Sequence, residues 1–460
     1  MKVLVLNPPT KDVRFSRDGR CQSEEGTWLD TFPPVYLASI AGAIREKYNV
    51  KLIDCMGSKI KFEECMQMIK DYNPDFAVIN TSTPTILMDL ETAKLIKEST
   101  NAKIIMYGEH ITARYKHLLE NYSQLDYAII GEPETPILNI LKGNHKVDGV
   151  ATRDWVGKVW QEPNLDQLPF PAYDLLPPYY FPLTGEIWMY VRSGRGCPYN
   201  CIYCVESLVS QHKLRYHSPE YMLKQFKWLA NELGIKLWMF WDELSTFDKS
   251  RMIKICELLI KEGLNKTCKW FCTTRVDHFD EDLAKIMKEA GCKMVAFGIE
   301  SGDQKVLDKN RKGITIEQIE KAVSAARKYN LRTIGHFIVG LPGSSPSSER
   351  KTIDFAKKLR LDFAQFYIAT PFPGSQLYEI ALENKWVKPI DDWEKVEQGT
   401  AVLSYPNFSN EEIQKWKRKA YHEFYFRPST ILRGLSMMSI NRIITKLPSY
   451  ALKFITWMNK

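Results

Sequence analysis

The chain has little of three features that would place it outside the cell or across a membrane. Its 10 cysteines among 460 residues are too sparse for a disulfide framework, which favours a reducing compartment. No apolar run reaches the roughly 20 residues that a spanning helix needs. The sequence opens on the strand-like residues 1–6 and not on the apolar region of a signal peptide. We therefore expect a cytoplasmic protein, long enough for two or three domains with full-sized cores.

Acidic residues are missing from the end of the chain. After Glu423 there is no Asp or Glu, and basic residues are spread among Ile, Leu, Met, Phe and Trp: Arg427, Arg433, Arg442, Lys446, Lys453 and Lys460. This basic amphipathic tail suits peripheral contact with a membrane or a lipid-like substrate, and a helix packed on the protein fits the same pattern. Elsewhere, Lys and Arg alternate with Asp and Glu along helical patterns. The net charge of +8 therefore predicts no nucleic-acid partner.

Apolar runs and helical patterns alternate through residues 1–147. Five runs have the length and composition of strands: residues 3–6, 50–53, 76–79, 103–106 and 127–130. The alternation predicts a doubly wound parallel sheet, which binds ligands beyond the carboxyl ends of its strands. The residues expected there are small or form hydrogen bonds: Asn7, Pro8, Ser82, Thr83, Gly108, Glu109, His110, Gly131 and Glu132.

A segment rich in Pro and aromatic residues, 148–182, predicts a semi-rigid linker. Strand and helix patterns alternate again over residues 183–395. The six expected strands are residues 188–192, 237–241, 270–274, 294–299, 333–339 and 363–368. Six such units predict a (β/α)6 partial barrel, with its chemistry at the carboxyl ends of the strands. Residues 396–460 predict a C-terminal helical segment.

Three cysteines in a Cys-x3-Cys-x2-Cys run follow the first expected barrel strand. Cys197, Cys201 and Cys204 lie in a turn-forming stretch with Gly194 and Gly196, so their thiolates can reach one point and hold a metal cluster. Three ligands leave one position open for a substrate. A zinc knuckle is disfavoured because zinc takes four ligands and no partner pair is present. Four other cysteines are expected to pack in the core: Cys256, Cys268, Cys272 and Cys292.

This stretch, with Tyr203 before the last cysteine, resembles the cluster loop of the radical S-adenosylmethionine (SAM) enzymes. The resemblance implies that Cys197, Cys201 and Cys204 hold a 4Fe-4S cluster whose open iron chelates the amino and carboxylate groups of SAM. Residues at the ends of the next barrel strands resemble SAM-contact positions of that family: Asp242, Glu243, Arg275, Glu300, Ser301, Gly340 and Pro342. Carboxylates can bind ammonium and hydroxyl groups, and Arg can face a carboxylate.

The sheet ahead of this motif resembles a cobalamin-binding domain, with residues 33–42 and 131–134 similar to its recurrent segments. Many cobalamin proteins carry an Asp-x-His-x-x-Gly motif whose His binds cobalt. Here Asp54 is followed by Cys55, Met56 and Gly57, and His110 is interpreted as a surface or structural residue. The resemblance therefore implies base-off cobalamin without a protein His on the metal.

The resemblance implies an enzyme that methylates an unactivated carbon of a small-molecule or lipid-like substrate through a 5′-deoxyadenosyl radical. An external one-electron reductant of the flavodoxin or ferredoxin type is expected. Cobalamin-linked cyclisation, oxidation or rearrangement without methyl transfer remains an alternative, as does a non-catalytic iron-sulfur protein. A tRNA methylthiotransferase is disfavoured because Cys21, Cys55 and Cys65 do not fall at three successive strand ends and the closing segment is not β.

Overall fold

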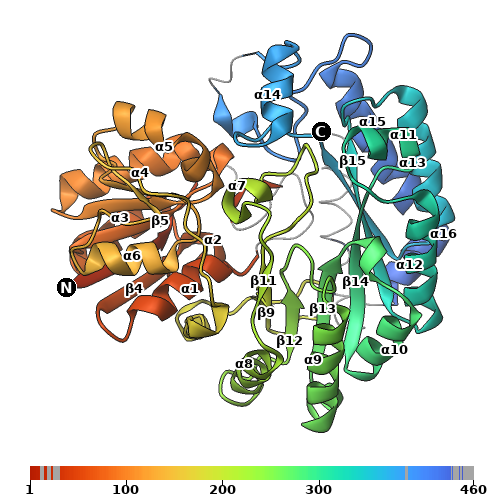
Figure 1. The fold of residues 1–460 in the computed structure, drawn as a ribbon, viewed down its shortest axis with the longest axis horizontal. Coiled ribbons are helices and arrows are strands. Elements are labelled where there is room, and N and C mark those ends of the chain that lie inside the picture. Colours follow the sequence, from red (N-terminus) through yellow and green to blue (C-terminus); the bar gives the residue numbers. More distant parts are fainter. Residues whose placement is uncertain are drawn as a thin grey trace. The chain divides into compact units, whose positions relative to one another are not determined.

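The computed structural model describes residues 1–10, 15–17, 22–23, 32–388, 392–436, 438, 445 and 448. The chain divides into two compact units (Figure 1). The first comprises Met1–Tyr179, Cys204–Arg215 and Pro371–Glu397, and the second comprises Tyr180–Tyr203, Tyr216–Thr370 and Gln398–Lys460. The segment expected as a linker thus lies mainly in the first unit, and two stretches of the expected barrel segment join it there.

A six-stranded sheet in the order β4-β1-β5-β6-β7-β8 forms the centre of the first unit. Its strands are β1 (Lys2–Asn7), β4 (Asn49–Asp54), β5 (Phe76–Asn80), β6 (Lys103–Tyr107), β7 (Tyr127–Ile129) and β8 (Val150–Ala151). The first five are parallel, which confirms the expected sheet, whereas β8 pairs antiparallel with β7. Two short strands, β2 (Phe15–Ser16) and β3 (Gln22–Ser23), pair with each other.

Two apolar cores cover the two faces of this sheet. Because side chains alternate along a strand, Leu4 and Leu6 of β1 enter one core, and Val3 and Val5 enter the other. The first core takes residues from α3 (Phe62–Tyr72), α4 (Ile86–Ser99) and α5 (Glu109–Asn121), and the second from α1 (Val35–Ile44) and α6 (Glu134–Leu141). The sheet is therefore doubly wound. The unit also contains α2 (Cys55–Ser58), α7 (Glu206–Ser210) and α14 (Gln376–Glu383).

The second unit contains a curled parallel sheet in the order β16-β15-β14-β13-β12-β9. Its strands are β9 (Trp188–Val191), β12 (Leu237–Phe240), β13 (Lys269–Thr274), β14 (Cys292–Glu300), β15 (Arg332–Val339) and β16 (Phe363–Ile368). All six match the expected strands, and the partial barrel is confirmed. Two short strands, β10 (Gly194–Arg195) and β11 (Arg215–Tyr216), pair with each other in the long connection between β9 and the helix that begins at Pro219.

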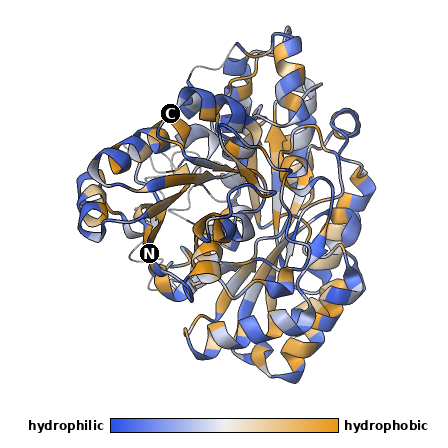
Figure 2. Cartoon of the chain, turned by 60° about the vertical axis from the view of Figure 1, so that its left-hand side comes forward, coloured by the Kyte–Doolittle hydropathy of each residue, from blue (hydrophilic) through white to orange (hydrophobic). Residues whose placement is uncertain are grey.

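Helices cover the outer face of the curled sheet, where Figure 1 shows α9, α10 and α12 along the strands. The helices are α8 (Pro219–Asn231), α9 (Lys249–Lys261), α10 (Glu281–Glu289), α11 (Gln304–Lys309), α12 (Ile316–Lys328) and α13 (Pro346–Lys358). Most begin at a side chain that accepts a backbone N–H of the first turn, as Ser218, Asp248 and Asp280 do. These caps fix where each loop beyond a strand ends. Strands are mainly hydrophobic and exposed helix faces hydrophilic (Figure 2).

The edge strand β16 is covered by helix α15 (Asn410–Tyr425). The backbone N–H of Phe366 donates to the Tyr421 hydroxyl at 3.2 Å. The Tyr425 hydroxyl accepts from the N–H of Ala364 and donates to its carbonyl, at 3.2 and 2.8 Å. The polar backbone of this edge is therefore bonded to side chains and not left open to another strand.

Among the described residues, no helix combines the length and apolarity required to cross a membrane. Most of the predicted basic tail, including Arg442, Lys446, Lys453 and Lys460, lies outside the described residues. The described part ends near helix α16 (Pro428–Leu435).

Candidate active site

The cysteine loop follows β9 at the carboxyl edge of the barrel sheet. Cys197, Cys201 and Cys204 form no disulfide bond and are partly exposed, whereas the six other described cysteines are buried. Among the described residues, no three His, Cys, Asp or Glu side chains are gathered as a metal ion requires. The fit therefore rests on donor chemistry: three partly exposed thiols in one short loop suit an iron-sulfur cluster, and metal sites commonly close around the metal as it binds.

Two carboxylates beyond β12 hold the base of this loop. Asp242 accepts the backbone N–H groups of Ser193 and Gly194 at 2.7 and 3.1 Å, and also the Ser193 hydroxyl. Glu243 forms an ion pair with Arg192 at 2.7 Å and accepts the N–H of Gly196 at 3.3 Å. Both residues lie where the sequence predicts, and their carboxylates bind the segment that enters the cysteine loop.

Arg275, beyond β13, contacts the same loop through Tyr199. Its guanidinium lies 3.5 Å from the centre of the Tyr199 ring and forms a two-bond ion pair with Asp277, at 3.0 and 2.9 Å. Burial alone would raise the pKa of Asp277, but the Arg275 guanidinium outweighs it and lowers that pKa. The Tyr199 hydroxyl bonds to Nε2 of His278. Arg275 is thus fixed between a carboxylate and an aromatic ring.

The end of β14 is built around a buried ion pair. Glu300 has φ +68°, a left-handed conformation that is unusual for a residue with a side chain, and the strand pairing shifts register beside it. Its carboxylate lies 2.7 Å from Nζ of Lys312, and both side chains are about nine-tenths buried. The neighbouring Ser301 hydroxyl bonds to Thr352 at 3.1 Å. Nothing along the chain links Lys312 to Glu300, so this partner could not be predicted from the sequence.

The turn beyond β15 is held on both sides of Gly340. Its N–H donates to the buried Glu349 carboxylate at 2.9 Å, and its carbonyl accepts the Tyr405 hydroxyl at 2.7 Å. Burial raises the pKa of Glu349 to about 7. Gly340 has φ +77°, and a Cβ there would lie 2.8 Å from Ile413. Glycine is therefore required at this turn.

Asn310 connects this turn to the cysteine loop. Its side-chain amide donates to the Pro342 carbonyl at 2.9 Å, and its backbone carbonyl accepts the N–H of Ile202 at 3.3 Å. The residue is fully buried, and Oδ1 has no hydrogen-bond partner among the described residues. A buried acceptor without a partner fits a bound ligand with hydroxyl or ammonium donors, such as SAM. Asn310 belongs to no sequence motif and could not be predicted from the sequence.

The nine residues predicted around cobalamin all lie at the carboxyl ends of β1, β5, β6 and β7. A buried polar network links the end of β1 to the end of β4. Asn7 donates to Asp54 at 2.7 Å and accepts from Arg17 at 3.1 Å, and Arg17 pairs with Asp89 at 2.6 Å with both side chains fully buried. Asp54 also accepts the hydroxyl of Tyr179, and burial raises the pKa of its carboxyl group.

His110 is buried in the first unit. Its Nδ1 lies 3.2 Å from the Thr83 hydroxyl, and its ring packs edge-on against Trp393 at 4.9 Å. Burial lowers the pKa of His110 to about 3, so the ring is neutral. Next to Thr83, the buried Thr81 hydroxyl has no hydrogen-bond partner among the described residues, which fits a polar ligand at this edge.

Glu132 anchors the stretch that follows the cysteine loop to the first unit. Its buried carboxylate pairs with Arg215 at 2.5 and 3.1 Å and accepts the N–H of Glu162 at 2.8 Å. Gly131 has φ +105°, and a Cβ there would lie 2.2 Å from the Trp160 carbonyl. These two predicted residues therefore have clear structural roles at the end of β7.

Residues 191–356 match the family model of the radical SAM superfamily, and residues 27–141 match that of the B12 binding domain. An uncharacterised methyltransferase of Pyrococcus horikoshii is 35% identical over 447 residues, 95% of each chain. An anaerobic magnesium-protoporphyrin IX monomethyl ester cyclase of Cereibacter sphaeroides is 25% identical over 87% of this chain and 68% of its own. Among solved structures, the radical SAM methyltransferase TsrM of Kitasatospora setae, with tryptophan and a SAM analogue bound, aligns with a TM-score of 0.67 at 16% identity, covering 96% of this chain and 89% of TsrM.

Proposed function

Because this chain belongs to the radical SAM enzymes that carry a B12-binding domain, we propose that it methylates an unactivated carbon of a small-molecule or lipid-like substrate. The observation that supports methyl transfer most is the P. horikoshii methyltransferase, which aligns over 95% of both chains. When bound, the 4Fe-4S cluster, SAM and cobalamin supply the radical and methyl-transfer chemistry. The protein supplies ligands, positioning and exclusion of water.

Cys197, Cys201 and Cys204 would hold the cluster, with Tyr203 beside the last of them. Asp242 and Glu243 fix the loop that presents the thiols, through the backbone N–H groups before Cys197. We propose that these carboxylates act mainly by positioning that loop, because the loop already occupies them. A loop held at its base in this way would lose less conformational freedom when the cluster and SAM bind.

SAM would lie at the carboxyl ends of β13, β14 and β15, near Arg275, Glu300 and the Gly340 turn. Glu300 is held by Lys312, and the turn is held by Glu349, so both present a fixed polar surface. Asn310 adds a buried acceptor beside Pro342. Asn310 thus joins the residues expected near SAM.

Cobalamin would lie at the carboxyl edge of the first sheet without a protein His on cobalt. Met56 stands where the common cobalamin motif has its His, and its side chain is buried. The motif's Asp is present as Asp54, but its carboxylate bonds to Asn7, Tyr179 and Gly57. His110 bonds to Thr83 and packs on Trp393, which supports its exclusion as a ligand.

Anaerobic reconstitution with iron, sulfide, cobalamin and SAM, followed by product analysis, tests this function. Methyl transfer yields 5′-deoxyadenosine together with S-adenosylhomocysteine. Failure to retain cobalamin would refute the assignment of the first sheet. The Cys201→Ala variant should lose the cluster absorbance and both products, whereas full activity of that variant in cells would favour a non-catalytic iron-sulfur protein.

Cyclisation, oxidation or rearrangement without methyl transfer is the second candidate function. It is favoured by the identity to the magnesium-protoporphyrin cyclase over 87% of this chain. The same reconstitution separates the two functions, because 5′-deoxyadenosine without S-adenosylhomocysteine supports the second.

The enzyme uses a substrate and a reductant, and we propose that a flavodoxin or ferredoxin delivers single electrons to the cluster. We also propose peripheral membrane contact through the C-terminal segment. In its described part, Ile431 and Leu432 are 48% and 67% exposed beside Arg433. This combination suits an anionic membrane surface. The test compares how much of the full chain, and how much of a chain that ends at residue 426, sediments with vesicles.

A further inference from the structure

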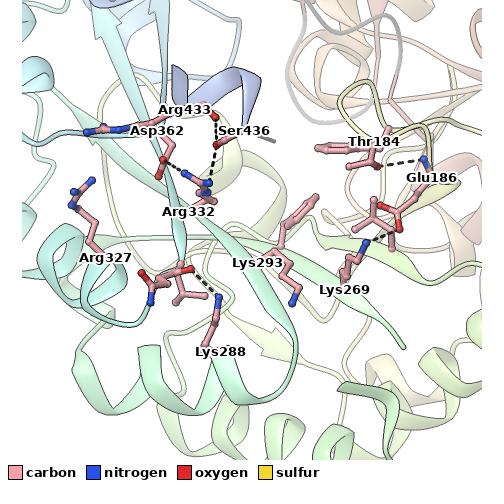
Figure 3. Close-up of a pocket in the computed structure, with 15 residues that line it drawn as sticks. Thr184, Glu186, Lys269, Lys288, Lys293, Arg327, Arg332, Asp362, Arg433 and Ser436 are labelled. Carbon is pink, nitrogen blue, oxygen red and sulfur yellow. Dashed lines mark hydrogen bonds and ion pairs between the residues drawn. The ribbon is translucent and has the colours of Figure 1, made fainter. Parts of the chain in front are cut away.

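A cavity of about 560 Å³ opens at the amino ends of the barrel strands (Figure 3). Leu237, Lys269 and Arg332 line it and are the first residues of β12, β13 and β15. Lys293 lines it as the second residue of β14, and Asp362 as the residue before β16. The cysteine loop follows the opposite end of β9, so the cavity is separate from the candidate active site.

Positive charge predominates in this cavity. Its lining includes two carboxylates, Glu186 and Asp362, and six basic residues: Lys269, Lys288, Lys293, Arg327, Arg332 and Arg433. Glu186 pairs with Lys269 at 2.8 Å, and Asp362 pairs with Arg332 at 2.9 Å. The other four basic residues have no carboxylate within ion-pair distance in the described part of the chain. The cavity therefore carries a net charge of +4.

Backbone carbonyls offset only part of this charge. Arg327 and Arg433 both donate to the Arg360 carbonyl, at 2.5 and 2.7 Å, and Lys288 donates to the Asn330 carbonyl at 2.9 Å. Lys288 and Arg327 lie in the last turns of α10 and α12, where carbonyl groups ordinarily attract cations. Lys293 has no such helix end beside it to account for its position, because it lies on a strand. It also has no hydrogen-bond or ion-pair partner among the described residues.

The basic groups also repel one another. Burial lowers the pKa of Lys288, and the charges of Lys293 and Arg332 lower it further. Burial likewise lowers the pKa of Arg327, with a contribution from Arg433. Each guanidinium keeps N–H donors beyond the one bonded to Arg360. An anion in the cavity would relieve the repulsion and accept these hydrogen bonds.

We propose that this cavity binds a phosphate group with more than one negative charge, from either a free phosphoanion or a lipid headgroup. Arginine forks match the oxygens of a phosphate, and lysine supplies compact charge. Apolar side chains of Phe181, Leu237 and Phe271 share the lining and suit the organic part of a phosphate ester. A volume of about 560 Å³ accommodates such a molecule.

Calorimetric titration of the anaerobically purified full chain with pyrophosphate tests the site. The double variant Lys288→Gln and Lys293→Gln removes two charges and should weaken pyrophosphate binding at least about tenfold. The control is Lys321→Gln, an exposed residue of α12 outside the cavity lining, and it should leave the affinity unchanged. Cluster content should be equal in all three proteins, so failure of the proposed enzyme function would not affect this result.

Vesicle sedimentation identifies the source of the phosphate. The probes are vesicles of phosphatidylcholine with phosphatidic acid, which carries a phosphomonoester, and vesicles of phosphatidylcholine alone. If the double variant no longer sediments with phosphatidic acid vesicles and Lys321→Gln still does, the phosphate group is that of a lipid headgroup. Pyrophosphate binding without sedimentation assigns a free phosphoanion. Absence of both, or equal losses in the double variant and the control, would overturn the proposal.

Discussion

Replacing Glu349 with Gln removes a buried carboxyl group whose protonation is linked to folding. Gln retains an oxygen that can accept the N–H of Gly340, so the turn beyond β15 keeps its bond. The variant loses only the titrating carboxyl group. In the folded wild-type protein, burial raises the pKa of Glu349 from 4.5 to about 7. The folded state therefore binds a proton more tightly than the unfolded state does.

The sign of the pH effect follows from this raised pKa. Glu349 contributes its full stability below about pH 4.5, and the contribution is lost as the pH rises through about 7. The pKa change corresponds to a free energy of about 3 kcal/mol. Relative to the Glu349→Gln variant, the wild-type chain should lose that amount of unfolding free energy between acid and mildly alkaline pH.

Thermal unfolding of both proteins from pH 5 to 8.5 measures this difference. The difference between the unfolding midpoints of the two proteins should change by roughly 6 to 12 °C across this pH range. The variant should gain relative to the wild type as the pH rises. Other titrating groups cancel in the comparison. Glu289→Gln, an exposed residue at the end of α10, is the control and should follow the wild type. A gap that does not vary with pH would refute the reasoning.

Three further substitutions test the barrel. Lys312→Met should lower the free energy of unfolding by about 3 to 5 kcal/mol, because it leaves Glu300 buried without its partner. Adding Glu300→Gln should restore part of that free energy. A double-mutant cycle measured by urea unfolding tests both expectations. Asp242→Asn should lower iron incorporation, because the Asp242 carboxylate holds the backbone that enters the cysteine loop; equal iron content in variant and wild type would contradict this. Tyr421→Phe should cost about 1 to 3 kcal/mol by removing the acceptor of the buried Phe366 N–H, which chemical denaturation can measure.

The sequence was sufficient for the strands and for the position of the candidate site. Periodicity located the five parallel strands of the first sheet and all six barrel strands, because apolar runs bounded by turn residues are local signals. Parallel topology then placed Asp242, Arg275, Glu300 and Gly340 at one edge without any knowledge of packing. The three cysteines were identified by spacing alone.

What the sequence could not supply are partners distant along the chain. Lys312 faces Glu300 because the chain turns back after α11, and Glu349 meets Gly340 only once α13 has packed. The left-handed φ of Glu300 is likewise a tertiary effect, since local preference opposes it. The strand β8 was missed because two residues within a Pro-rich segment have no periodicity to detect.

The two tyrosine hydroxyls of α15 that bond to the backbone of β16 also affect the order in which the chain can fold during synthesis. Strand β16 ends at Ile368, whereas Tyr421 and Tyr425 lie more than fifty residues further on, so a ribosome releases a half barrel with a bare edge before it releases the cover. Until α15 docks, that edge can pair with another nascent chain. A chain whose synthesis stops before Asn410 should therefore aggregate. Helix α15 protects the sheet that it covers from pairing with strands of other chains.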